Sequence, residues 1–432
     1  MNSAKRYTIF RSGLILSLYL IAVTFPLPYK LSNPWIITMV LFGLLERIYR
    51  PQSDMKPRAD SLELAVLWSF LALFGLISLS LVYTDNLDLG LKNIEGKLSL
   101  LAFPVILYHL RLKKKEFWSI ISSFIISITL ATIYLLAKST IHYYTNSSWL
   151  TYHDFVRDFG GHAVFYSYYL FLSIVLSIFL ITKKASQKAW NVLYASAILI
   201  ALIGLLFCAS KNVTVVSLFF GVGILLKRYL KKGIRGKEIL ITAAAVLALA
   251  VVALQMKPVK NRMAELFSGS GMQAYEKVKR GEQIKDEDVG QLNGTSVRLI
   301  FWYIGIDEVF DQDKLLLGLS PGDRRDLINE RYRDLGLYKY YKSYNLHNQF
   351  IQTFVELGLL GLLIYCLLNF FLLLMAIKHG NGPLLVLLLA SLIFQMTESI
   401  LERNKGIVFF IFFFCFLQQL RDLSYESRNT GH

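Results

Sequence analysis

Long apolar stretches separated by short polar segments run through this sequence of 432 residues. A membrane-spanning helix needs about 20 apolar residues, so the pattern predicts an all-α polytopic membrane protein with about twelve spans. The expected spans are roughly 10–27, 32–46, 62–83, 97–110, 117–137, 163–182, 190–209, 213–227, 238–255, 357–377, 383–399 and 406–420. Residues 1–255 would hold nine spans, 256–346 a long polar loop with short helices, and 347–432 the last three spans and a tail.

The distribution of basic residues predicts the orientation of these spans. Clusters of Lys and Arg follow the second, fourth, sixth and eighth spans, and further basic residues precede the first. All of them fall on one side when the spans are threaded, and the positive-inside rule identifies that side as the cytoplasm. Both termini are then cytoplasmic, and 256–346 lie on the outer side. The net charge of +16 is explained in this way without a nucleic-acid partner.

A polar stripe leads into the tenth span, in the sequence SYNLHNQFIQTFVELGLLG. His347 lies where this helix would leave the bilayer, and Gln349, Gln352 and Glu356 follow on one helix face. Such a stripe is costly in a membrane unless it faces other helices or a wet cavity. His347 is therefore either a reactive group beside the lipid or an ordinary interfacial histidine at a helix start.

The long polar loop contains two expected helices. Val297–Phe310 follows the cap-like Thr295 and Ser296, and it would lie flat on the membrane or pack against the mouth of the bundle. A charged run from Glu276 to Asp288 is typical of a mobile excursion.

The second expected helix of the loop runs from about Asp323 to Leu335, after a Gly/Pro turn. Its first turn carries Arg324 and Arg325, and the free N–H groups and positive end of a helix favour anions. The alternative is a solvated helix laced with salt bridges. Both interpretations stay open for the two arginines.

The motif content points to chemistry on a substrate that arrives activated. The sequence has no phosphate-binding loop, no dinucleotide-binding turn and no HExxH motif. At the outer face, a sugar on a polyprenyl diphosphate is the obvious donor, and its transfer needs cations for the leaving group and a base for the acceptor hydroxyl. Arg298 and His347 are the candidates, with Arg157, Lys211 and Arg403 as further cations. No metal ligands have suitable spacing, so we expect neither a metal nor a cofactor.

Two other polar groupings have both a structural and a functional interpretation. One face of the sixth span carries His162, Tyr166, Tyr169 and Ser173. This face is either a hydrogen-bonding seam in the core or part of a substrate groove. Near the last outer turn, Glu398, Glu402 and Arg403 either pair with one another or help to fix an arginine of the active site.

Several of these segments together resemble the O-antigen ligase and polymerase superfamily. HNQFIQTFVELGLLG resembles its His-x10-Gly signature, SVRLIFW its Arg-x3-Trp segment and LLLGLSPGD its Gly-x-x-Pro-Gly turn. The matching positions are His347, Gly358, Arg298, Trp302, Gly318, Pro321 and Gly322. The sequence departs from the family at Lys211, where members commonly have arginine after the serine. Lysine can neutralise a phosphate but cannot grip it with two parallel hydrogen bonds.

The resemblance implies a metal-independent glycosyltransferase of GT-C-like helical architecture, most like a lipopolysaccharide O-antigen ligase. Such an enzyme moves a glycan from undecaprenyl diphosphate to the lipid A core at the periplasmic face of a bacterial inner membrane. Arg298 would hold the diphosphate and His347 would be the base. Substrate contacts are expected from Lys211, Arg157, His162, Tyr166, Arg324, Arg325, Gln352, Glu398 and Arg403.

Three alternatives to a ligase stay open. An O-antigen polymerase or a protein O-oligosaccharyltransferase of the same superfamily would share these motifs. A transporter of lipid-linked glycans belongs to another class, and it calls for ionisable residues at mid-membrane and repeated halves with broken helices.

The expected topology can be tested by chemical labelling. A cysteine placed at Gly271, in the long polar loop, should react with a membrane-impermeant thiol reagent in intact spheroplasts. Labelling that appears only after lysis would contradict the orientation deduced from the basic clusters.

Overall fold

The computed structural model describes residues 3–52, 60–182, 188–210, 220 and 271–421, and the regular structure in these ranges is helical. Within these described ranges, seven segments are long and apolar enough to cross a membrane: α1 (Ser3–Thr24), η1 with α2 (Tyr29–Tyr49), α3 with η3 (Ser61–Tyr83), α6 (Lys114–Asn146), α7 (Ala163–Thr182), α8 (Lys188–Cys208) and α17 (Gln349–Lys378). Shorter apolar helices are α18 (Gly382–Gln395) and α19 (Asn404–Leu417). The prediction of an all-α polytopic membrane protein is confirmed. The expected spans 213–227 and 238–255 lie outside the described residues, apart from Phe220.

Two segments that the predicted spans leave as connections, 84–96 and 138–162, contain helix. The polar segment before the fourth span forms α4 (Leu87–Lys97), which is followed by α5 (Ser99–His109). With 11 residues, α5 is about 16 Å long, roughly half the hydrocarbon thickness of a bilayer. The fifth span continues as α6 to Asn146, beyond its expected end near residue 137.

The chain divides into two compact units. Unit 1 comprises 1–7, 43–112 and 268–432, and unit 2 comprises 8–42 and 113–267. These two units reflect the packing of the chain. The division into 1–255, 256–346 and 347–432 made from the sequence describes membrane topology instead, and it stays a prediction. Within unit 2, α7 is almost entirely buried and packs against α6 and α8, and Arg11 of α1 pairs with Glu116 of α6 at 2.8 Å.

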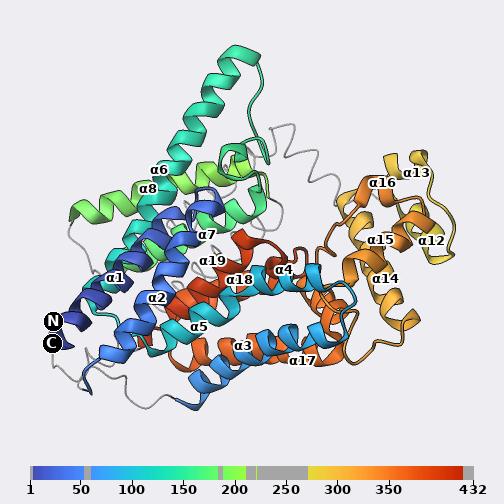
Figure 1. The fold of residues 1–432 in the computed structure, drawn as a ribbon. Helices are drawn as coiled ribbons and strands as arrows, with labels where there is room; N and C mark the ends of the chain where they lie inside the picture. Colours follow the sequence, from blue (N-terminus) through green and yellow to red (C-terminus); the bar gives the residue numbers. More distant parts are fainter. Residues whose placement is uncertain (1–2, 53–59, 183–187, 211–219, 221–270, 422–432) are drawn as a thin grey trace, which may run out of the picture. The chain divides into compact units, whose positions relative to one another are not determined.

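In unit 1, α3 and α17 run side by side, and the short helices of the polar loop gather at one end of them (Figure 1). At the other end of α17, Lys378 Nζ lies 2.8 Å from Asp60 Oδ2, just before α3. The hydrogen bond from Lys378 holds the pKa of the Asp60 carboxyl at about 2, below its ordinary value of 3.8. This ion pair therefore stabilises the fold at neutral pH. Its contribution to stability is lost as the pH falls from about 3.8 to about 2, where the Asp60 carboxyl becomes protonated.

The polar loop forms a helical subdomain, α12 (Met272–Lys279), α13 (Asp286–Gly290), α14 (Gly294–Asp311), α15 (Arg324–Asp334) and α16 (Tyr338–Tyr341). Both expected loop helices are confirmed, although Asn293 rather than Thr295 or Ser296 caps α14. The apolar face of α14 packs into the core of this α12–α16 subdomain, where Phe301 is fully buried. The charged run expected to be a mobile excursion is ordered by α12 and α13, with Lys277 paired to Asp288 at 2.7 Å.

Gly358 breaks α17. Its backbone angles, φ 63° and ψ −161°, lie in a region that is essentially restricted to glycine. The break leaves carbonyl groups of the preceding turn without helical partners, and the loop before α15 supplies them. The Leu319 N–H donates to the Val355 carbonyl at 2.8 Å, and the Ser320 N–H donates to the Glu356 carbonyl at 3.1 Å.

The same loop pairs with the chain beyond the break. The N–H groups of Leu359 and Leu360 donate to the carbonyls of Leu315 and Leu316, at 3.0 and 3.3 Å. The two backbones touch so closely that a Cβ at Gly358 would lie 2.3 Å from Leu316. A Cβ at Gly318 would likewise lie 2.5 Å from the backbone of α17. The glycines of two separate sequence motifs are therefore explained by one backbone-to-backbone contact.

We predict that Gly358→Ala destabilises the fold by at least about 2 kcal/mol, through backbone strain and overlap with Leu316. Thermal unfolding of the detergent-solubilised protein would measure this loss. Gly75→Ala in α3 is the matched control, because its Cβ would meet nothing within 4 Å. Equal stability of the two variants would contradict the contact.

The structure indicates a better position than Gly271 for the cysteine in the labelling experiment. Gly271 has φ +82°, and a Cβ there would lie 2.4 Å from Ser296 Oγ. A cysteine at the exposed Gln283, in the same subdomain, avoids this strain and tests the same orientation.

Candidate functional site

The backbone on either side of His347 is held in an unusual conformation. The Leu346 carbonyl accepts a hydrogen bond from Trp302 Nε1 at 2.8 Å, and the Leu346 N–H donates to Gln352 Oε1 at 3.0 Å. His347 itself has φ +48°, in the left-handed region, and its N–H donates to Asn345 Oδ1 at 3.1 Å. A non-glycine residue keeps such a conformation only where its surroundings over-determine it.

This backbone aims the His347 ring at a buried carboxylate. His347 Nδ1 lies 3.1 Å from Glu398 Oε2, and Arg298 Nη2 lies 3.4 Å from the other carboxylate oxygen. The Glu398 side chain is only 5% exposed, whereas those of His347 and Arg298 are 21% and 29% exposed. A carboxylate can only accept, so Nδ1 carries the hydrogen and the accepting nitrogen of a neutral ring is Nε2.

Arg298 is held by two more contacts. Its Nε donates to the Thr397 carbonyl at 3.2 Å, and its Nη1 donates to the Gly294 carbonyl at 2.8 Å. Arg298 and Trp302 lie one helical turn apart on α14, so the Arg-x3-Trp segment reaches both Glu398 and the residue before His347. We call His347, Glu398 and Arg298 the His–Glu–Arg cluster.

The turn that carries Glu398, residues 396–403, is hydrogen-bonded to the start of α17. Asn348 caps this helix with its side-chain oxygen and donates from its amide nitrogen to the Met396 carbonyl at 3.2 Å. Gln349 Oε1 accepts the Leu401 N–H at 2.8 Å. The amide side chains in the polar stripe of the sequence thus position the turn.

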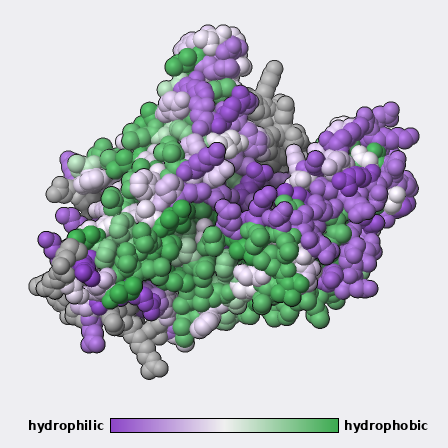
Figure 2. All heavy atoms as spheres, viewed as in Figure 1, coloured by the Kyte–Doolittle hydropathy of each residue, from purple (hydrophilic) through white to green (hydrophobic). Residues whose placement is uncertain are grey.

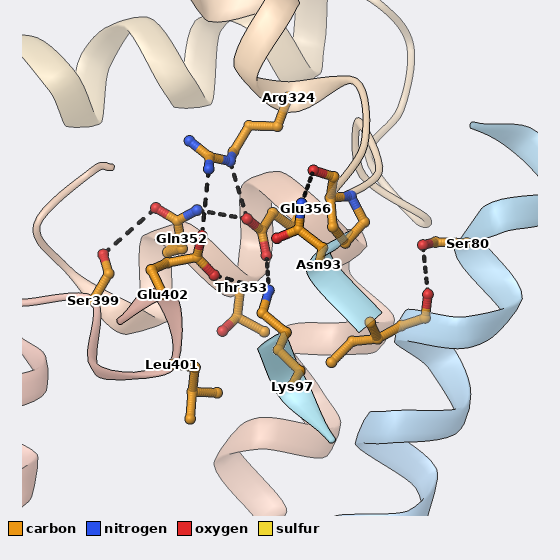
Figure 3. A network of polar contacts seen from close by, with 12 residues as sticks. Ser80, Asn93, Lys97, Arg324, Gln352, Thr353, Glu356, Ser399, Leu401 and Glu402 are labelled. Carbon is orange, nitrogen blue, oxygen red and sulfur yellow. Dashed lines mark hydrogen bonds and ion pairs between the residues drawn. The ribbon is translucent and has the colours of Figure 1, made fainter. Parts of the chain in front are cut away.

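Four further charged side chains form a buried quartet (Figure 3). Lys97 Nζ is 2.9 Å from Glu356 and 2.8 Å from Glu402. Arg324 contacts the same two carboxylates, at 3.0 and 3.4 Å. Each of the four side chains is at most 9% exposed, and two positive charges balance two negative ones. The quartet joins α4, α15, α17 and the 396–403 turn.

Gln352 connects the quartet to the cluster (Figure 3). Its Nε2 donates to Glu356 at 2.6 Å, and its Oε1 accepts from the Leu346 N–H at 3.0 Å and from Ser399 Oγ at 3.5 Å. Leu346 precedes His347 in the chain and Ser399 follows Glu398. Gln352 is fully buried with both ends of its amide engaged, so its contacts are those of a positioning residue rather than of the substrate contact expected from the sequence.

The structure changes the interpretation of the other charged candidates in unit 1. Arg324 is buried in ion pairs, so the solvated-helix interpretation is wrong for it, and its guanidinium faces carboxylates rather than an open anion site. Arg325 and Arg403 are exposed. Pairing within the last outer turn is also wrong as a description of Glu398 and Glu402, because both bind partners distant in the chain.

The remaining candidates belong to unit 2 or lie outside the described residues. Arg157 is exposed and pairs with Asp154, and the ring of His162 lies 5.2 Å from that of His153. Tyr166 is buried, and its hydroxyl is 3.0 Å from Thr132 Oγ1, as a hydrogen-bonding core seam requires. Lys211 is not among the described residues. Substrate contacts by these four stay predictions.

Sequence reasoning did not single out Lys97. The sequence offers one indication: Lys97 lies at the start of one apolar run, and the oppositely charged Glu356 lies at the start of another. Opposite charges at a similar expected membrane depth are candidates for pairing, because an unpaired charge there is costly.

A comparison with protein families supplies an independent finding. Residues 196–366 match a family model described as O-antigen ligase. The match includes Arg298, His347 and Gln352 and ends before Glu398. No curated protein matches the chain.

We predict that Lys97→Met destabilises the protein by on the order of 3–5 kcal/mol, because it leaves two buried carboxylates with one cation. Lys92→Met, on the exposed side of the same helix, is the control. Adding Glu402→Gln to Lys97→Met restores the charge balance and should recover part of the loss. Thermal unfolding would measure all three, and equal stability of the two lysine variants would contradict a paired quartet.

Proposed function

We propose that this chain is a glycosyltransferase that moves a glycan from undecaprenyl diphosphate to the lipid A core, a function supported by the match of residues 196–366 to a family model described as O-antigen ligase. The observation that carries the proposal is the His–Glu–Arg cluster, in which a histidine and an arginine reach solvent on either side of one buried carboxylate. This arrangement puts a proton acceptor and a cation side by side, as displacement of a diphosphate by a hydroxyl requires.

His347 acts on the acceptor in this proposal. The acceptor oxygen forms a bond to the anomeric carbon of the donor sugar while the bond from that carbon to the diphosphate oxygen breaks. The hydroxyl proton passes to His347 Nε2, and the electron pair of the broken bond leaves with the diphosphate. Glu398 holds the Nδ1 hydrogen and balances the imidazolium that forms.

Arg298 acts on the leaving group. A guanidinium has five N–H donors, and the three contacts of Arg298 leave two of them for a ligand. Two parallel hydrogen bonds to phosphate oxygens are the geometry that arginine favours. Arginine can in this way neutralise charge on the diphosphate, and we propose that transfer needs no metal.

We place the reaction at the periplasmic face of a bacterial inner membrane, with both chain termini in the cytoplasm. The basic clusters in the sequence support this orientation. Deletion of the gene tests the proposed acceptor: loss of a ligase leaves polymerised glycan on the carrier lipid and bare lipid A core. Single repeat units attached to the core would instead indicate the polymerase of the same superfamily.

The roles of His347 and Arg298 can be separated by one set of measurements. We expect His347→Ala to keep donor affinity and to lose about 10²–10⁴-fold in single-turnover transfer, the range for a general base. Arg298→Lys should weaken donor binding and slow transfer on the order of a hundredfold, because the paired hydrogen bonds are lost.

Both assays use purified protein, lipid-linked glycan and acceptor in excess EDTA. Arg280→Lys, at an exposed position of the α12–α16 subdomain, is the matched control for the arginine substitution. Loss of donor affinity in His347→Ala together with full transfer by Arg298→Lys would reverse the assigned roles. Wild-type activity that returns only with added magnesium would contradict the metal-independent proposal.

A further inference from the structure

Three consecutive leucines lie exposed in the loop between α14 and α15. The exposed fractions of Leu315, Leu316 and Leu317 are 39%, 62% and 42%. This leucine loop belongs to the part of the chain that is otherwise polar: Lys314 precedes it and Ser320 follows shortly after. A contiguous exposed apolar patch of this kind marks an interaction surface rather than a random surface position.

The leucine loop is continuous with the lipid-facing surface of a candidate membrane span. The carbonyls of Leu315 and Leu316 accept hydrogen bonds from Leu359 and Leu360 of α17, whose side chains are 43% and 44% exposed. One turn further along α17, Leu363 is also exposed. Figure 2 shows hydrophobic surface over α3 and α17 that reaches the edge of the hydrophilic α12–α16 subdomain.

The carbonyl groups of the leucine loop all accept hydrogen bonds from within the protein. Irregular backbone is tolerated next to hydrocarbon only where its polar groups find partners within the protein. All three leucine carbonyls have one: besides the two bonds to α17, the Tyr83 hydroxyl donates to the Leu317 carbonyl at 2.7 Å.

The residues at the edge of the loop suit the boundary between lipid and water. Lys314 Nζ lies 6.0 Å from the centre of the Tyr83 ring, at the end of the α3–η3 span. Tyrosine is enriched at membrane interfaces, and lysine there keeps its charge among the headgroups while its stem covers apolar surface.

We propose that the side chains of Leu315–Leu317 insert into the hydrocarbon edge of the bilayer and anchor the α12–α16 subdomain to it. The occupant of this surface is the acyl chains of ordinary membrane lipids. The anchor has a consequence for the site, because Leu319 and Ser320 of the same loop bind the α17 carbonyls beside the buried quartet. Lipid contact therefore helps to hold the break in α17 in place.

A spin label at Leu316 tests this insertion in the full-length protein. The exposed Cys366 is replaced by serine, while the buried Cys208 and Cys415 stay. The protein is reconstituted into vesicles of phosphatidylethanolamine and phosphatidylglycerol without polyprenyl lipid. Accessibility of the label to oxygen, which partitions into hydrocarbon, is compared with accessibility to a water-soluble nickel chelate.

We expect a label on Leu316→Cys to be reached several-fold more readily by oxygen than by nickel, as a label on Leu363→Cys in α17 should be. A label on Gln283→Cys, on the water-exposed side of the subdomain, should show the reverse preference. If the Leu316 label behaves like the Gln283 label, or becomes protected only after polyprenyl lipid is added, bilayer anchoring is wrong. Leu317→Cys repeats the test at a second position, and neither measurement depends on enzymatic activity.

Discussion

The interruption of α17 at Gly358 is the constraint on which the rest of the site depends. An unbroken helix would use its own carbonyls at Val355 and Glu356, and the loop before α15 would have no backbone partner there. The break frees these carbonyls for Leu319 and Ser320. Because that loop leads directly into α15, docking it on α17 brings Arg324 to Glu356, and the buried quartet can form.

The quartet is linked to the His–Glu–Arg cluster through the side-chain amide of Gln352. Buried charges are stable only when they are paired and hydrogen-bonded, and Lys97, Arg324, Glu356 and Glu402 satisfy one another. Gln352 also accepts hydrogen bonds from Leu346 and Ser399. These two residues are the chain neighbours of His347 and Glu398, so Gln352 helps to position both. The left-handed backbone of His347 is consistent with such support from outside. The polar stripe at the start of α17 therefore has two roles: Glu356 stabilises the fold through the buried quartet, and Gln352 positions the backbone beside His347.

Sequence patterns predict the parts of this arrangement that depend on local chemistry. Apolar length predicts the seven long apolar segments of the described residues, and capping residues and a Gly/Pro turn predict α14 and α15. The roles of His347 and Arg298 stay predictions from what diphosphate chemistry needs. The cost of polar groups near lipid predicts that Gln352 and Glu356 face either other helices or a wet cavity. Both side chains are buried in the protein. The pairings themselves could not be predicted, because Lys97 and Glu356 are separated by 259 positions. The motif glycines Gly318 and Gly358 can be recognised in the sequence. The contact between two backbone segments that requires them can be seen only in the folded structure.

We propose that His347 and Glu398 act as one unit on the acceptor hydroxyl. A double-mutant cycle in single-turnover transfer, with donor affinity measured in parallel, tests it most directly. Residues that act as a unit are strongly non-additive when both are removed. We expect Glu398→Gln to slow transfer in the wild-type background and to cause little further loss once His347 is alanine. Losses that multiply in the double variant would show that Glu398 acts independently of His347, and the two residues would then not form one unit.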